Sequence, residues 1–141
     1  MEKMSFEMES RACNEQFARV VVAVFLSRLD PTVEELDDVK TAVSEAVMNC
    51  VIHGYEEGEG IIRVEVSIDG RTAAVRVIDH GVGIADVKKA MEPMYTSRPD
   101  KERSGMGFSF MEAFMDELEV ESEPGKGTVV TMKKTIGGTE Q

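Results

Sequence analysis

The chain has 141 residues, of which 42% are hydrophobic and 30% charged, a composition that excludes a disordered protein. This length predicts one domain over residues 1–141. The 27 acidic and 16 basic residues give a net charge of −11, which argues against binding to nucleic acid or an anionic membrane, because phosphates need clustered Lys and Arg. The N-terminus "MEKMSFEMES" has no signal-peptide apolar region and no apolar run reaches membrane-spanning length, so a cytoplasmic protein is expected.

The first elements in chain order are a short strand and a helix. Residues 5–9, "SFEME", alternate weakly and predict an edge strand. A helix is predicted from Asn14, its expected N-cap, to Asp30-Pro31, since a residue before proline leaves the helical region. Five apolar side chains share one stripe of this helix: Phe17, Val20, Val21, Val24 and Phe25.

A second helix is marked at both ends. Thr32 followed by Glu35 is the pattern of a capping box, and Gly54 is expected to stop the helix. One face of this helix is apolar and is predicted to be buried: Leu36, Val39, Val43, Ala46, Val47 and Cys50.

The rest of the chain predicts two hairpins separated by a helix. Residues 61–68 and 72–79 alternate about Asp69-Gly70, a hairpin signal, and Asp79 ends the inward-facing row of the second strand. A helical pattern covers residues 104–118, and "EVES", "EPGKG" and "TVVTMKK" predict a closing hairpin. This order predicts a two-layer α+β sandwich, with a mostly antiparallel, mixed sheet covered on one face by helices. Five side chains of the last helix are expected to face inward: Phe108, Met111, Phe114, Met115 and Leu118.

A polar row on the second helix is the first feature that suggests chemistry. Glu45, Asn49 and His53 recur every four residues, and such a row is more often a solvated face. Asn is however a poor helix-interior residue, and its carbonyl suits Mg²⁺. A glutamate one turn earlier can accept a proton from an attacking hydroxyl. The row alone leaves both interpretations open, and for His53 a structural role is the better one.

A second cluster follows the predicted strand that ends at Asp79. In "DHGVGI", a buried Asp79 carboxylate needs partners to offset desolvation, and a base edge with an exocyclic amine would satisfy it. Gly81 and Gly83 would let the backbone approach that ligand closely.

A third cluster, "RSGMGF", opens the last predicted helix. Gly105 and Gly107 free the backbone there, and the N–H groups of a helix N-terminus form an anion site. Arg103 adds a bidentate phosphate donor. The pattern is neither a Walker A loop nor a dinucleotide fingerprint.

The three clusters, in this order, resemble the GHKL superfamily of ATP-binding proteins. Within it, "NEQFARV", "SEAVMNCVIHGYEE" and "ERSGMGFSFMEAFMD" are similar to the anti-sigma-factor serine kinases, and the likeness spans residues 5–135. The resemblance implies ATP or ADP and Mg²⁺ as ligands and a homodimer. It also implies that the chain inhibits a sporulation sigma factor and phosphorylates an anti-anti-sigma protein on serine.

The resemblance also implies roles for single residues. Asn49 matches the Mg²⁺-coordinating asparagine and Glu45 the proposed catalytic base. Asp79 matches the aspartate that binds the adenine amine, and Thr128 the threonine that completes adenine recognition through water. Further nucleotide-binding positions are implied at Gly81, Gly83, Thr96, Ser97, Arg98, Ser104, Gly105, Met106, Gly107 and Phe108.

Two arginines and a lid complete what the resemblance implies. Arg103 is expected to offset charge during catalysis, residues 86–104 to form the ATP lid, and Arg19 to engage protein partners. A general-stress anti-sigma kinase and a non-catalytic, nucleotide-gated sigma-binding module remain as alternatives. A stand-alone ATPase or histidine kinase is disfavoured, because the chain has no room for a transducer domain or a dimerisation helix.

Overall fold

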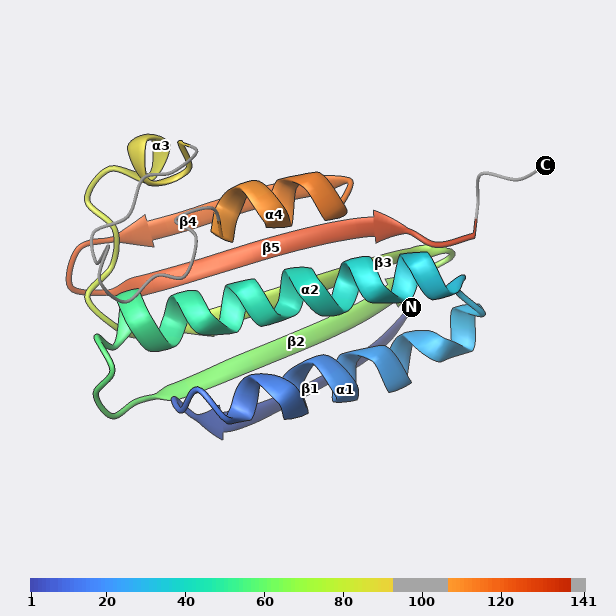
Figure 1. Cartoon of the computed structure of the whole chain (residues 1–141), viewed down its shortest axis with the longest axis horizontal. Coiled ribbons are helices and arrows are strands. Elements are labelled where there is room, and N and C mark those ends of the chain that lie inside the picture. Colours follow the sequence, from blue (N-terminus) through green and yellow to red (C-terminus); the bar gives the residue numbers. More distant parts are fainter. Residues whose placement is uncertain (93–106, 138–141) are drawn as a thin grey trace.

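The computed structural model describes residues 1–92 and 107–137, in which five strands form one sheet (Figure 1). The strand order is β1-β2-β3-β5-β4, and every described pair is antiparallel. The two-layer α+β fold is thereby confirmed, with a sheet that is antiparallel at each described pair. The strands are β1 (Glu2–Glu9), β2 (Ile61–Asp69), β3 (Thr72–Asp79), β4 (Glu117–Glu123) and β5 (Gly127–Thr135).

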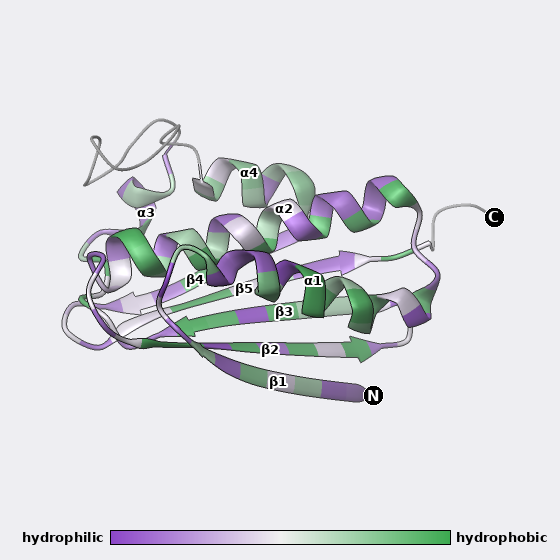
Figure 2. Cartoon of the chain, turned by 60° about the horizontal axis from the view of Figure 1, so that its bottom comes forward, coloured by the Kyte–Doolittle hydropathy of each residue, from purple (hydrophilic) through white to green (hydrophobic). Residues whose placement is uncertain are grey.

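The helices all lie on one face of the sheet (Figure 2). Helix α1 contacts β2, α2 contacts β3, and α4 contacts β4. Within the two described stretches, no helix is long and apolar enough to cross a membrane. The helices are α1 (Asn14–Leu26), a 3₁₀ turn η1 (Ser27–Leu29), α2 (Val33–Asn49), a π-helical turn η2 (Cys50–Gly54), α3 (Val87–Ala90) and α4 (Gly107–Phe114).

The core lies between the sheet and the helices. Alternate side chains of the central strands point to opposite faces, so the inward set of each strand meets the apolar face of α2. The expected inward row of β3 is confirmed, since Asp79 is 4% exposed. The largest contributions come from Ile62, Val64, Val66, Ala73, Val75, Val77, Val130 and Met132 in the sheet, and from Val39, Val43, Ala46 and Val47 in α2.

Helix α2 begins as the sequence predicts but ends differently. The Glu35 N–H donates to Thr32 Oγ1 (3.0 Å) and the Thr32 N–H to Glu35 Oε1 (2.9 Å), which completes the capping box. At the other end the helix widens into the π turn, and the Tyr55 N–H donates to Cys50 O (2.8 Å). Gly54 ends this turn without the positive φ of a left-handed cap. The backbone conformation at this position therefore does not require a glycine.

Helix α1 corrects two expectations. Its N-cap is Cys13, while the Asn14 side-chain amide donates to Glu9 O (2.9 Å). Of the predicted apolar stripe, only Phe25 is buried. The helix is apolar on nearly every side, so periodicity alone did not identify the face that packs on α2 and the sheet. The buried face is Ala18, Val22, Phe25 and Leu26, and the exposed stripe is Phe17, Val20, Val21 and Val24.

Helix α4 is shorter than the pattern over residues 104–118 suggested. It ends at Phe114, and β4 begins at Glu117. The Lys134 ammonium donates to the Phe114 carbonyl (2.9 Å), so a side chain from β5 satisfies an acceptor that a longer helix would have used. Leu118 still packs against the core, but from a strand.

Candidate functional site

The π turn at the end of α2 meets the end of β3 in a close backbone contact. A Cβ atom built on Gly54 would lie 2.9 Å from Asp79 Oδ2, so a side chain there would displace the carboxylate. A Cβ on Gly81 would overlap the Gly54 carbonyl, which accepts from the Val82 N–H (2.8 Å). The two glycines therefore let the loop after β3 dock on the π turn, and this places Asp79 against the helix.

Asp79 is a buried acceptor held by few donors. Its Oδ1 accepts from the Gly81 N–H (2.9 Å). Burial raises the pKa of Asp79, while the Gly81 N–H, the Cys50 thiol and the Thr128 backbone oppose that rise. Burial, with the nearby Asp79 charge, raises the pKa of Cys50 well above its ordinary value, so this cysteine stays a neutral thiol. A ligand that brings a donor to Asp79 would offset its desolvation.

The first two residues of the polar row on α2 face the start of α4. A Cβ built on Gly107 would lie 3.4 Å from Glu45 Oε1 and 3.5 Å from Asn49 Oδ1. Both side chains therefore reach a helix N-terminus, where unpaired N–H groups favour anions. His53, the third member, lies half-buried in the π turn.

Asn49 fits the requirements of a Mg²⁺ ligand. Its Nδ2 is buried and has no hydrogen-bond partner among residues 1–92 and 107–137. The orientation of such an amide is set by its partners, so this one is free to present its oxygen to a cation. The described residues hold no group of three or more His, Cys, Asp or Glu side chains that gathers around one point. A cation here would take its remaining ligands from phosphate and water, as Mg²⁺ commonly does.

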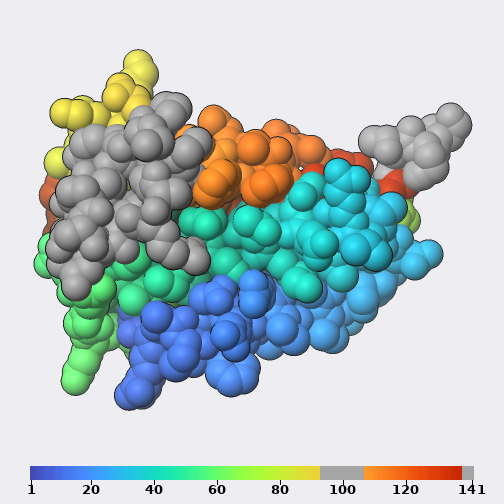
Figure 3. Space-filling model, viewed as in Figure 1, coloured from blue at the N-terminus to red at the C-terminus, as the bar shows by residue number. Residues whose placement is uncertain are grey.

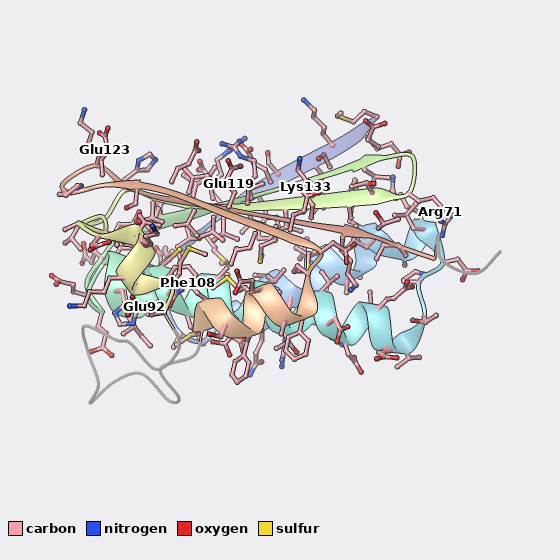
Figure 4. The ribbon with its side chains drawn as sticks, turned by 90° about the horizontal axis from the view of Figure 1, so that it is seen from above. Arg71, Glu92, Phe108, Glu119, Glu123 and Lys133 are labelled. Carbon is pink, nitrogen blue, oxygen red and sulfur yellow. The ribbon has the colours of Figure 1, made fainter. Side chains whose placement is uncertain are left out.

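The β5 side of the site contains Thr128, the cross-strand neighbour of Asp79. Thr128 is 8% exposed, and its hydroxyl contacts Ser122 of β4. Gly83 lies against the turn between β4 and β5, where a Cβ would overlap the Glu123 carbonyl. Asp79, Gly81, Gly83 and Thr128 thus lie at one end of the sheet; Figure 4 shows Glu123 at this end and Arg71 at the other.

Tyr55 and Ser122 are two site residues that the sequence did not reveal. The Tyr55 hydroxyl donates to Ile61 O (2.6 Å) and accepts from the His80 N–H (2.8 Å), which joins the end of α2 to the residue after Asp79. Tyr55 lies within the quoted stretch "SEAVMNCVIHGYEE" but was given no role, and Ser122 belongs to no motif. Each acts through contacts between segments distant in the chain. A single sequence carries no signal for such contacts.

The remaining predicted residues fall into three groups. Arg19 lies on α1, half-exposed, with its Nε 4.0 Å from Glu15 Oε2. Phe108 packs against the core from the first turn of α4. From the expected lid, residues 86–92 are described, and Asp86 Oδ1 accepts from the Lys89 N–H at the start of α3 (3.1 Å). The predicted residues that lie outside the described ones are Thr96, Ser97, Arg98, Arg103, Ser104, Gly105 and Met106.

Comparison with known proteins first defines a class. The family described as the histidine kinase-like ATPase domain matches residues 9–134. The catalytic domain of the histidine kinase ThkA has a TM-score of 0.59 at 15% identity and covers 96% of this chain and 97% of its own. The RsbU and RsbW domains of Rv1364c from Mycobacterium tuberculosis give a TM-score of 0.68 at 19% identity, over 96% of this chain and 32% of that longer one. The fold is that of a nucleotide-binding ATPase domain.

Sequence relatives then define the branch. The chain is 58% identical over 134 residues to an anti-sigma F factor of Thermoanaerobacter, which covers 95% of this chain and 94% of the relative. It is 60% identical over 133 residues to the anti-sigma F factor of Clostridium kluyveri, with 94% of each chain covered. The chain therefore belongs to the anti-sigma F factor family.

Proposed function

We propose that this chain binds ATP and Mg²⁺, holds and inhibits a sporulation sigma factor in that state, and phosphorylates an anti-anti-sigma protein on serine. The supporting observation is the approach of Gly107 to Glu45 and Asn49. It brings a candidate base, a candidate metal ligand and a helix N-terminus together, and Asn49 directly precedes Cys50, whose thiol hydrogen-bonds to Asp79. Such a set is sufficient for phosphoryl transfer, which depends mainly on positioning and electrostatics.

Each residue has a distinct part in this proposal. Asp79 accepts a hydrogen bond from the exocyclic amine of the base, and the α4 N-terminus faces the phosphates. Asn49 would hold Mg²⁺, which when bound neutralises phosphate charge. Glu45 accepts the proton of the attacking serine hydroxyl as its oxygen bonds to the γ-phosphorus and ADP leaves. Arg103 is proposed to offset the developing charge.

The partner proposal rests on the family and on charge. The relatives are anti-sigma factors by name, and a net charge of −11 suits a partner with a basic, nucleic-acid-binding face. Arg19 is the proposed contact for protein partners. Its side chain is 41% exposed and so can exchange Glu15 for a carboxylate of a partner.

A homodimer is also proposed, through the exposed stripe of α1 and the edge strand β1. Phe17 is 67% exposed and Val24 66%, and with Val20 and Val21 they form an exposed apolar stripe on α1. The N-terminal segment that includes α1 lies along the lower edge of the molecule in Figure 3. A second copy would remove this apolar stripe from water. Strand β1 lies at the edge of the sheet and, within residues 1–92 and 107–137, pairs with a strand on one side only.

The decisive experiment incubates the protein with labelled ATP, Mg²⁺ and the candidate anti-anti-sigma partner. We expect label on a partner serine with the wild type and with Glu34→Gln, an exposed carboxylate on the first turn of the same helix. We expect Glu45→Gln to lose transfer by at least about a hundredfold and to retain ATP binding. ATP binding and sigma-factor capture without transfer would favour the nucleotide-gated module. Absence of ATP binding would refute both functions.

A further inference from the structure

Ser122 is the second-last residue of β4, and its side chain links β4 to β5 and to the loop after β3. It is the cross-strand neighbour of Thr128, which is in turn the neighbour of Asp79, so the three side chains form one row across β4, β5 and β3. Ser122 Oγ lies 2.7 Å from Ile84 N, 2.9 Å from Gly127 O and 2.8 Å from Thr128 Oγ1. All three distances are those of hydrogen bonds.

The proton count of these three contacts fixes their direction. A serine hydroxyl has one proton and two lone pairs. The Ile84 N–H can only donate, so Ser122 accepts there, and the Gly127 carbonyl can only accept, so Ser122 donates there. With its proton used, Ser122 must accept from Thr128. The Thr128 proton therefore points towards Ser122, and only its lone pairs remain for a ligand.

The row consequently presents acceptors alone to a bound base. The Asp79 carboxylate accepts, and Thr128 cannot turn its proton towards the ligand without losing the bond to Ser122. An amine at position 6 of a purine, or a water that donates to Thr128, matches this edge. A carbonyl at position 6 would face two acceptors, and unmatched buried polar groups are costly.

We propose that Ser122 is a positioning residue that fixes the direction of the Thr128 hydroxyl and thereby makes the site select purines with an amine, rather than a carbonyl, at position 6. This inference rests on the proposed function, because it takes Asp79 and Thr128 as the residues that bind the base. It adds a specificity determinant on a strand that contributes no motif.

The test measures dissociation constants for ATP and for ITP, which carries a carbonyl at position 6, by calorimetry with Mg²⁺. We expect the wild type to prefer ATP. Ser122→Ala frees the Thr128 proton to donate to the carbonyl of ITP. The ratio of the ITP dissociation constant to the ATP dissociation constant should therefore fall about tenfold, the effect of one hydrogen bond gained by ITP. Ser122→Thr keeps a hydroxyl and should restore the wild-type ratio.

A double-mutant cycle separates this role from mere packing. In a Thr128→Val background, Ser122→Ala should leave the ratio unchanged, since no hydroxyl remains to be directed. A purely structural Ser122 would weaken ATP and ITP equally in the single variant, and that result would overturn the inference. Should Ser122→Ala not fold by circular dichroism, Ser122→Cys, whose thiol is a weak hydrogen-bonding group, should lower the ratio less but in the same direction. An unchanged ratio would again overturn the inference.

The wild-type measurement distinguishes the two proposals. ATP binding with an unchanged ratio in the Ser122 variants would refute the role of Ser122 alone. No ATP binding by the wild type would refute the proposed function, and the inference with it.

Discussion

At the scale of single residues, the missing side chain of Gly54 decides where Asp79 can lie. Any Cβ at this position would overlap three atoms of the Asp79 carboxylate, the nearest of them 2.9 Å away. The glycine ends the helix in the sequence pattern, but its backbone angle is not that of a helix-stopping glycine. Its contact with Asp79 is the physical reason for it.

Replacement of Gly54 should therefore affect binding more than stability. We expect Gly54→Ala to push the Asp79 carboxylate aside and to weaken ATP binding about tenfold or more, as measured by calorimetry. Gly70→Ala is the matched control, because Gly70 has a φ of 65° and no atom within 4 Å of a built Cβ. It should lower the free energy of unfolding by about 1 kcal/mol and leave binding unchanged. Equal ATP affinity in Gly54→Ala and wild type would contradict this account.

Tyr55 provides a second residue-scale prediction. Tyr55→Phe removes the acceptor of the His80 N–H and the donor to Ile61 O. We expect a loss of about 1–2 kcal/mol in the free energy of unfolding, from the groups left unpaired. A several-fold weaker affinity for ATP should accompany it, because the loop after Asp79 loses its tie to α2. Urea titration and calorimetry measure the two effects, and an unaltered affinity would show that the tie does not position the loop.

At the scale of elements, α2 links the two ends of the molecule. Its last turns carry Glu45 and Asn49, while its first turn is bound to the end of the described chain, since the Gly137 N–H donates to Glu35 Oε2 (2.9 Å). At that same end Arg71 donates to the Leu29 carbonyl (2.6 Å). The helix start, the β2–β3 turn and the chain after β5 therefore form one hydrogen-bonded corner, opposite the candidate site (Figure 4).

The pKa of Glu35 makes this corner sensitive to acid. The Gly137 N–H, followed by the Thr32 N–H, lowers the pKa of Glu35 below its ordinary 4.5. A carboxylate with a lowered folded-state pKa adds stability that is present above the unfolded-state pKa and lost as pH falls through the folded-state pKa. We expect Glu35→Ala to cost about 1–2 kcal/mol near neutral pH, the usual range for a cap. The difference from wild type should shrink below pH 4.5.

Urea denaturation at a series of pH values measures that difference. Glu34→Ala is the control, because Glu34 lies on the same first turn, is exposed and makes neither of these hydrogen bonds. A Glu35→Ala difference that does not depend on pH would show that packing, and not the ionised carboxylate, stabilises the corner.

At the scale of the whole molecule, the exposed stripe of α1 governs assembly in our proposal. Placing a charge there should be costly in a dimer, where it would be buried, and nearly neutral in a monomer. We expect Val24→Asp to raise the dimer dissociation constant about a hundredfold by analytical ultracentrifugation. Val33→Asp, at a valine outside the stripe that is 78% exposed against 66% for Val24, should have no effect.

The net charge of the chain makes the expected dimer affinity depend on salt concentration. Two copies of −11 each repel one another, and salt screens exposed charges beyond a Debye length of roughly 8 Å at physiological ionic strength. The wild-type dimer should therefore weaken in low salt. A wild type that is monomeric at all salt concentrations would refute the dimer proposal.

Much of the fold and part of the site could be predicted from the sequence. The hairpin about Asp69-Gly70 and the capping box of Thr32 are local, so a few adjacent residues suffice to specify them. The inward position of Asp79 followed from the two-residue period of a strand.

Only the tertiary structure decided the features that depend on a partner surface. The apolar residues of α1 cover nearly its whole circumference, and packing against α2 and the sheet selects which of them are buried. Gly54 is fixed by the Asp79 carboxylate rather than by the helix end. The hydroxyl of Ser122 acquires its direction from Ile84, Gly127 and Thr128, which the chain brings together from two strands and a loop. The sequence by itself determined periodicity and caps, because these are local; faces, close approaches and proton directions arise only when distant segments pack.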